Sequence, residues 1–112
     1  MSFATETEKL VNELIQAEYK NACEQFGDKF HSLHEGYAVL LEEVEETEEE
    51  INDMSRWIAE LWSMIKNDDS EDIESQLEWI EVSIINAIEE LAQAGAVVRK
   101  ILTTREGVKD EN

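Results

Sequence analysis

The sequence predicts an all-α protein, an antiparallel bundle of three to four helices in which two helices are long. The chain of 112 residues contains no proline and only four glycines, so little in its composition would interrupt a helix. Apolar residues recur at intervals of three and four over most of its length, which is the period of one helix face. A polar stretch at 67–72 is rich in residues that begin helices and predicts the clearest loop.

The first helix is expected at residues 6–26. Thr5 and Glu8 have the spacing of a capping box at its start, and Gly27 supplies a C-terminal stop. Between these ends, apolar residues recur at helical spacing: Leu10, Val11, Leu14, Ile15, Ala22 and Phe26.

The second helix is expected to begin at Leu33, because Ser32 and Glu35 form another capping box, and to run to about Lys66. Its apolar seam is a series of residues seven apart, interleaved with a second series: Tyr37, Val44, Ile51, Ile58 and Ile65, then Leu40, Met54 and Leu61. For a helix of this length, a kink or break between residues 50 and 55 is the alternative.

The third helix follows the polar loop, with a stripe formed by Ile73, Leu77, Ile80, Ile84, Ala87, Ile88, Leu91, Ala94, Val98 and Ile101. The periodicity ends near Thr103, so residues 103–112 are expected to fray, as are residues 1–5, at the two ends of a single domain spanning 1–112. Two long amphipathic helices leave apolar surface uncovered in so short a chain. We therefore expect a homodimer or homotetramer.

The chain is strongly acidic, with 28 Asp and Glu against 9 Lys and Arg and a formal net charge of −19. This charge argues against direct binding to nucleic acid or to an anionic membrane. It leaves two interpretations, carboxylates that hold a divalent metal ion or a solvated acidic surface. The single cysteine, Cys23, excludes a disulfide within the chain and fits a reducing compartment. With no long apolar segment and no signal-peptide pattern, we expect a soluble, cytoplasmic protein.

Two pairs of polar side chains flank the apolar stripes. At about 100° per residue, Glu43 and Glu46 lie one turn apart beside the seam of the second helix. Glu90 and Gln93 have the same relation to the stripe of the third helix. Antiparallel packing would bring the four side chains together, as in the metal sites of helix bundles. The alternative is that the glutamate-rich segment at 42–50 is a solvated face.

The segment at 34–46 resembles the opening of the catalytic helix of the MazG-like, all-α nucleoside triphosphate pyrophosphohydrolases, particularly the short forms found in phages and prophages. The EExxE motif of that family matches Glu42, Glu43 and Glu46. Its second motif, ExxD, falls on Glu90 and Gln93, where glutamine replaces the aspartate, and the spacing between the motifs is longer than usual. The resemblance covers roughly residues 30–102 and is more specific in its first half.

The resemblance implies an enzyme dependent on Mg²⁺, with Mn²⁺ as the alternative, that hydrolyses nucleoside or deoxynucleoside triphosphates to the monophosphate and pyrophosphate and so cleans the nucleotide pool. Glu43, Glu46 and Glu90 would be the metal ligands. Gln93 would be a neutral ligand in place of aspartate. Glu42, turned outward from Glu43 by about 100°, would orient or deprotonate the attacking water, or lie at the surface.

Candidates for phosphate binding are few. The basic cluster that often follows the second motif of the family is absent, which leaves Arg99 and Lys100 as the nearest cations. His31 and His34, three residues apart at the start of the second helix, could also approach a phosphate, although capping and surface roles are commoner for such residues.

Two other functions fit the same sequence. The first is a non-catalytic, acidic helical module that binds a basic protein or mimics the charge of nucleic acid. The second is a degenerate family member that binds nucleotide or metal with little turnover. Gln93 favours this second alternative.

Overall fold

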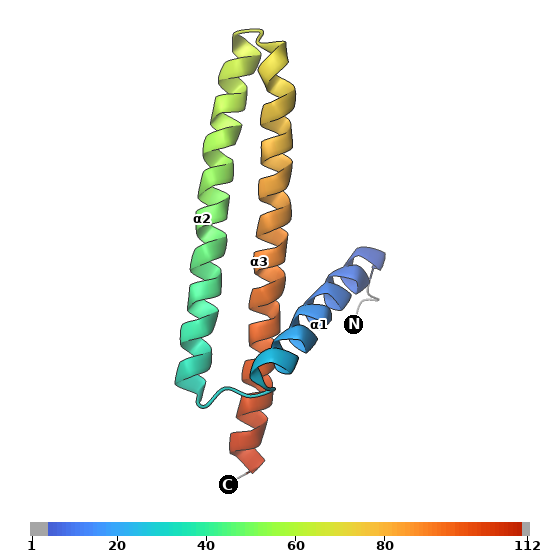
Figure 1. The fold of residues 1–112 in the computed structure, drawn as a ribbon, viewed down its shortest axis with the longest axis vertical. Helices are drawn as coiled ribbons and strands as arrows, with labels where there is room; N and C mark the ends of the chain where they lie inside the picture. The colour runs from blue at the N-terminus through green and yellow to red at the C-terminus, as the bar shows by residue number, and fades with distance from the viewer. Residues whose placement is uncertain (1–4, 111–112) are drawn as a thin grey trace. The chain divides into compact units, whose positions relative to one another are not determined.

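The computed structural model describes residues 5–110, with side chains described through Gly107, and consists of three helices (Figure 1). They are α1 (Glu6–Phe26), α2 (Leu33–Lys66) and α3 (Ser70–Asp110). No strand occurs within residues 5–110, so the all-α prediction is confirmed. The expected bounds of the first two helices are also confirmed, and α2 is a single helix of 34 residues with no break between residues 50 and 55.

Both predicted caps at the helix starts are present. The backbone N–H of Glu8 donates to Thr5 Oγ1 at 3.0 Å, and that of Glu35 donates to Ser32 Oγ at 3.1 Å. In the second cap the Glu35 carboxylate accepts from the N–H of His31 at 3.3 Å. Gly27 ends α1 with a φ of 85°, a value that glycine adopts without strain. These contacts are local, which is why the sequence predicts them well.

The end of α3 differs from the expectation. The helix continues to Asp110, well past the expected onset of fraying at Thr103. The Thr104 side chain is 3% exposed, and its hydroxyl accepts from the N–H of Phe30 at 2.8 Å and donates to the Lys100 carbonyl at 2.8 Å. The helix therefore continues beyond the apolar stripe, where a hydrogen bond joins Thr104 to Phe30, a residue far away in the sequence. The remaining expected frayed ends, 1–4 and 111–112, lie outside the described residues.

The chain divides into two compact units. Unit 1 comprises Met1–Val44 and Leu91–Asn112, which means α1, the start of α2 and the end of α3. Unit 2 is the continuous segment Glu45–Glu90, a hairpin made of the rest of α2, a short loop and the start of α3. No helix within residues 5–110 has the length and apolar character that crossing a bilayer requires.

The loop of the hairpin is short and acidic. Asp68 has a φ of 55°, in the left-handed region that aspartate tolerates better than most residues. The pKa of Asp72 is raised from its usual value, first by a hydrogen bond with Asp69 and then by the like charge of that carboxyl group. Ser70 begins α3 immediately after this turn.

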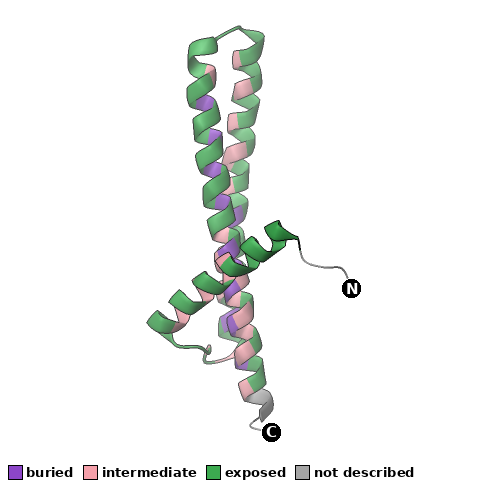
Figure 2. Ribbon diagram, turned by 90° about the vertical axis from the view of Figure 1, so that its right-hand side faces the viewer, coloured by how far each residue is buried: buried purple, intermediate pink, exposed green. Residues whose placement is uncertain are grey.

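The interior of unit 2 is narrow and largely polar. Its buried residues are Thr47 on α2 and Gln76, Ile80, Ser83 and Ala87 on α3. Figure 2 shows that buried positions recur along the hairpin. Gln76 Nε2 donates to the Trp57 carbonyl at 2.8 Å and to Glu60 Oε2 at 3.1 Å. Ser83 Oγ donates to Glu50 Oε1 at 2.7 Å. Polar side chains therefore join the two helices at two successive levels.

Only one of the two series expected in the seam points inward: Leu40, Met54 and Leu61 are half-buried. The series that begins at Tyr37 is exposed, with Ile51 and Ile58 retaining 46% and 50% of their accessible surface. The inward positions of α2 in unit 2 recur at alternating steps of three and four, as Thr47, Glu50, Met54, Trp57, Leu61 and Met64. Ile51, Ile58 and Ile65 each come directly after an inward residue of α2. They therefore lie on the flank of the hairpin. The sequence pattern identified two apolar series but did not distinguish the one that packs within the hairpin from the one that stays exposed.

Replacing Thr104 tests the order at the end of α3. Thr104→Val keeps the shape of the side chain but leaves the N–H of Phe30 without its acceptor, so we expect the free energy of unfolding to fall by about 1–3 kcal/mol. Chemical denaturation followed by circular dichroism measures this change. Glu106→Gln, at an exposed position one half-turn further on, is the control and should change stability by less than about 0.5 kcal/mol. Equal stabilities for the two variants would mean that the contact is absent.

Candidate functional site

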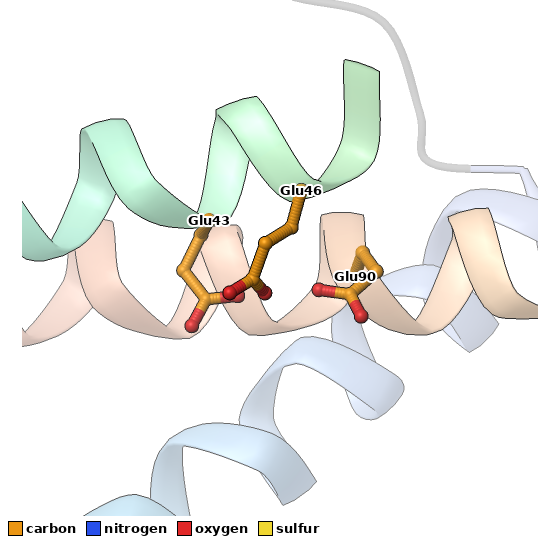
Figure 3. Close-up of side chains that lie close together, drawn as sticks. All are labelled: Glu43, Glu46 and Glu90. Atoms are coloured by element: carbon orange, nitrogen blue, oxygen red, sulfur yellow. The ribbon is translucent and has the colours of Figure 1, made fainter. Parts of the chain in front are cut away.

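Three carboxylates meet beside the seam of the two long helices. Glu43 and Glu46 on α2 and Glu90 on α3 each offer one oxygen, and the three atoms lie within 4.8 Å of one another (Figure 3). Glu46 and Glu90 both belong to unit 2, and Glu43 lies one turn before Glu46 on the unbroken α2 helix. We call Glu43, Glu46 and Glu90 the carboxylate trio.

The members of the trio differ in exposure. Glu43 and Glu90 are half-buried, and one oxygen of each is shielded from solvent, whereas Glu46 is exposed. Two like charges about 4 Å apart repel each other by about 4 kcal/mol at the effective dielectric constant of a protein surface. Close, partly desolvated carboxylates are therefore stabilised by a cation placed among them.

The trio fits a hard divalent cation. Mg²⁺ is bound by oxygen ligands at about 2.0–2.1 Å, so two ligand oxygens on one ion lie roughly 3–4 Å apart. The oxygens of the trio span up to 4.8 Å, and small side-chain rotations would bring them within that range. Three protein ligands would also leave positions for water or substrate, as is usual for Mg²⁺.

A cavity of about 740 Å³ lies in unit 1, with Glu43 in its wall. This volume is within the range of small-molecule binding sites. Its lining comes from α1, the linker, α2 and α3: Glu18, Asn21, Ala22, Gln25, Phe26, Lys29, Phe30, His31, Glu35, Val39, Glu43, Gln93, Ala96, Val97 and Lys100. Glu43 therefore belongs both to the carboxylate trio and to a cavity large enough for a nucleotide.

Lys100 is the most buried cation of this cavity. Its residue is only 7% exposed, and its Nζ lies 4.4 Å from the centroid of the Phe30 ring. The electrostatic attraction between a cation and an aromatic face offsets part of the hydration free energy that the cation loses on burial. An anion that enters the cavity would find this ammonium already in place, and the linker cation Lys29 lines the same wall.

The other expected phosphate-binding residues lie elsewhere. The Arg99 guanidinium donates to Gln16 Oε1 at 2.8 Å and to Asn12 Oδ1 at 3.2 Å, so it joins α3 to α1 and does not line the cavity. His34 is exposed and is not part of the cavity wall, and Glu42 is likewise exposed on α2. Gln93, by contrast, is half-buried and lines the cavity. It comes three residues after Glu90 of the carboxylate trio in the sequence.

Of the linker residues in the cavity wall, sequence reasoning singled out only His31, as a residue that could approach a phosphate. Lys29, Phe30 and His31 lie between α1 and α2, in a segment with no helical period. Their only sequence signal is composition, a basic residue, an aromatic residue and a histidine in succession within a strongly acidic chain. A non-periodic segment takes its position from tertiary contacts, here from the bond between the Phe30 N–H and Thr104.

Comparisons of the chain with protein-family models, with curated proteins and with solved structures give no match. The similarity to the MazG-like family therefore depends on the motif residues alone.

Mg²⁺ should stabilise the protein through the carboxylate trio. In thermal unfolding we expect the midpoint to rise with Mg²⁺ concentration until the site is full, because a ligand that binds the folded state alone adds about 2.7 kcal/mol at 100 times its Kd. Glu46→Gln should reduce this rise severalfold. It should also raise the midpoint slightly in the presence of EDTA, because one of three like charges is lost.

Glu45→Gln is the matched control, since Glu45 is an exposed neighbour of Glu46 on the same helix but is outside the trio. It should respond to Mg²⁺ as the unchanged protein does. An equal response of both variants would count against a metal site at the trio.

Proposed function

We propose that this chain is a nucleoside triphosphate pyrophosphohydrolase that requires Mg²⁺, or Mn²⁺ in its place, and acts in the cytoplasm as a phage- or prophage-type enzyme of nucleotide-pool cleaning. The observation that carries the proposal is that Glu43 is shared by the carboxylate trio and by a cavity that holds a buried lysine. The match of Glu42, Glu43 and Glu46 to the EExxE motif supports it from the sequence.

The charges of the two partners explain why a metal ion is needed. The chain has a net charge of −19 and the substrate is a polyanion, so the two repel each other unless a cation lies between them. When bound, Mg²⁺ neutralises charge on the phosphoryl oxygens and lowers the pKa of a water ligand towards neutrality.

The residues of the chain divide the remaining tasks. Glu43, Glu46 and Glu90 hold the metal, and the Gln93 amide is a neutral ligand or contacts a phosphate. Lys100 binds phosphate oxygens from within the cavity. These groups hold the substrate in one orientation, which together with charge stabilisation is most of what phosphoryl transfer requires.

Further side chains act at the edges of this site. Glu42 receives the proton of the attacking water or orients that water, from an exposed position next to Glu43. Lys29 and His31, from the linker, contact the outer phosphates, since both line the cavity. The Phe26 and Phe30 rings provide apolar wall for the base or sugar.

The test is release of pyrophosphate from a panel of ribo- and deoxynucleoside triphosphates, with and without Mg²⁺. We expect metal-dependent release that Glu43→Gln and Glu90→Gln each reduce by 100-fold or more, because a ligand to the metal is lost. Glu45→Gln should retain full activity. The proposal fails if no nucleotide is cleaved and Mg²⁺ neither binds nor stabilises the protein.

The same assay compares the effects on KM of removing two neighbouring cations, Lys100 and Arg99. Lys100→Met should raise KM by at least tenfold, because a cation of the cavity wall is removed. Arg99→Met removes an equal charge one residue away, from a guanidinium that bonds to α1, and should change KM by less than threefold. Equal effects would place the phosphates outside the cavity.

A second function is favoured by Gln93, which stands where the family motif has aspartate. A neutral amide is a weaker ligand than a carboxylate, so the chain would bind metal and nucleotide with little turnover. Gln93→Asp should then raise the rate of pyrophosphate release at least tenfold while Mg²⁺ stabilises both proteins. An unchanged or lower rate would show that the glutamine is compatible with full activity.

A further inference from the structure

A small pocket lies between two tryptophan rings of unit 2. It has a volume of about 290 Å³ and is lined by Trp57 of α2 and by Gln76 and Trp79 of α3. The ring centroids of Trp57 and Trp79 are 5.9 Å apart, and the two ring planes meet at 62° in an edge-to-face arrangement. The two rings therefore form walls at an angle to each other, and we call this site the tryptophan pocket.

Gln76 forms the buried base of the pocket. The residue is 8% exposed, and its Nε2 donates to the Trp57 carbonyl at 2.8 Å and to Glu60 Oε2 at 3.1 Å. Both N–H groups of the amide are used in these two bonds, so the hydrogen-bonding atom that remains on this side chain is the acceptor Oε1. The second bond also holds the exposed Glu60 carboxylate beside the pocket. The polar groups that Gln76 and Glu60 present to a ligand are therefore acceptors, one of them charged.

The unit that holds the pocket carries most of the negative charge of the chain. Unit 2 contains 16 Asp and Glu residues against two cations, Arg56 and Lys66, which gives a net charge of −14 out of the −19 of the whole chain. Both cations have partners, because Arg56 forms an ion pair with Asp53 and Lys66 lies over the ring of Trp62. A field of this sign attracts cations and repels anions. The charge of the hairpin therefore selects a cationic ligand for the pocket.

The aromatic faces point to the same kind of ligand. Tryptophan attracts cations more strongly than the other aromatic residues. Trp62 meets this preference within the chain, since Lys66 Nζ lies 5.7 Å from its ring centroid. Within residues 5–107, no lysine or arginine of the chain lies over Trp57 or Trp79, although Trp79 is as exposed as Trp62, at 58% each. The pocket therefore offers indole faces to a cation that comes from outside the described chain.

We propose that the tryptophan pocket binds an ammonium group of an aliphatic polyamine. The methylene chain packs on the indole rings, and the ammonium group lies against a π face while it donates to Glu60 and to Gln76 Oε1. A fully methylated ammonium has no N–H to donate to these acceptors, so it is the weaker ligand. The volume suits one alkylammonium group, being close to the lower end of small-molecule sites. The proposal does not depend on the proposed enzyme activity.

The neighbouring carboxylates favour a ligand with several ammonium groups over a single lysine side chain. Asp53 and Glu60 each come directly before an inward residue of α2, as Trp79 comes directly before the buried Ile80 of α3. In an antiparallel pair of helices such positions lie along one edge. The two carboxylates are seven residues apart, or about 10 Å along the helix, a separation that a flexible polyamine bridges. The exposed ion pair of Asp53 with Arg56 is weak enough for a second ammonium group to replace it.

The test is titration of the full chain with spermidine, a linear triamine, by isothermal titration calorimetry in 0.15 M NaCl. We expect saturable binding of one spermidine per chain. Trp79→Leu removes a wall of the pocket and Glu60→Gln removes its carboxylate, so each should weaken binding at least fivefold while circular dichroism shows a helical chain. Trp62→Leu, at an equally exposed indole, and Glu78→Gln, at an exposed carboxylate beside Trp79 in the sequence, are the matched controls. Each control should change the affinity by less than twofold.

The other outcomes also decide the question. If Trp79→Leu does not fold, Glu60→Gln decides, because it changes an exposed side chain and keeps an acceptor for Gln76. Tetramethylammonium should bind at least tenfold more weakly than spermidine. A peptide with one lysine that binds more tightly than spermidine would assign the pocket to a protein partner and overturn the proposal. Weaker binding in Glu46→Gln but not in Glu60→Gln would place spermidine at the carboxylate trio and overturn it too, as would the absence of saturable binding up to 10 mM spermidine.

Discussion

The register between the two long helices is the constraint on which the candidate site depends. In unit 2 it is fixed by two polar contacts, Gln76 with the Trp57 carbonyl and Ser83 with the Glu50 carboxylate. A step of seven residues along α3 from Gln76 to Ser83 is matched by a step of seven back along α2 from Trp57 to Glu50. The next equal step reaches Glu90 on α3 and Glu43 on α2, two members of the carboxylate trio. Slipping the hairpin by one turn would break both contacts and separate the carboxylates, so the polar interior specifies the site.

Much of the local structure followed from the sequence because its causes are local. Thr5 and Ser32 cap the helices that they precede, and the absence of proline lets α2 run unbroken. Glu43 and Glu46 lie on one flank because they are three residues apart on a helix. Three features were not predictable in this way. Apolar periodicity does not say which of two neighbouring stripes packs inside the chain, so the Ile51 series was placed in the seam although it is exposed. The linker has no period, and the bond from Phe30 to Thr104 joins residues far apart in the chain.

The acidic composition takes on a different meaning once the burial of each group is known. Most glutamates at 42–50 are exposed, as in any solvated face, but Glu43 is half-buried and lines a cavity. In the wall of the same cavity, Lys100 is almost fully buried, with its ammonium over the Phe30 ring. A buried cation in a chain of net charge −19 marks a place that prefers an anion. Function is therefore better indicated by the few charges that are desolvated than by the many that are not.

The attachment of α1 has a consequence for how a ligand reaches the cavity. The helix has no buried residue among those described, and it approaches α3 where Gly95 leaves room for the Ile15 side chain, whose atoms lie 3.0 Å from the site of a Cβ there. Elements with few buried contacts open at the lowest free-energy cost. Because α1 contributes Asn21, Ala22 and Gln25 to the cavity wall, its local opening would enlarge the entrance while α2 and α3 keep the carboxylates in place. The first helix therefore forms part of the cavity wall while depending little on burial for its own position.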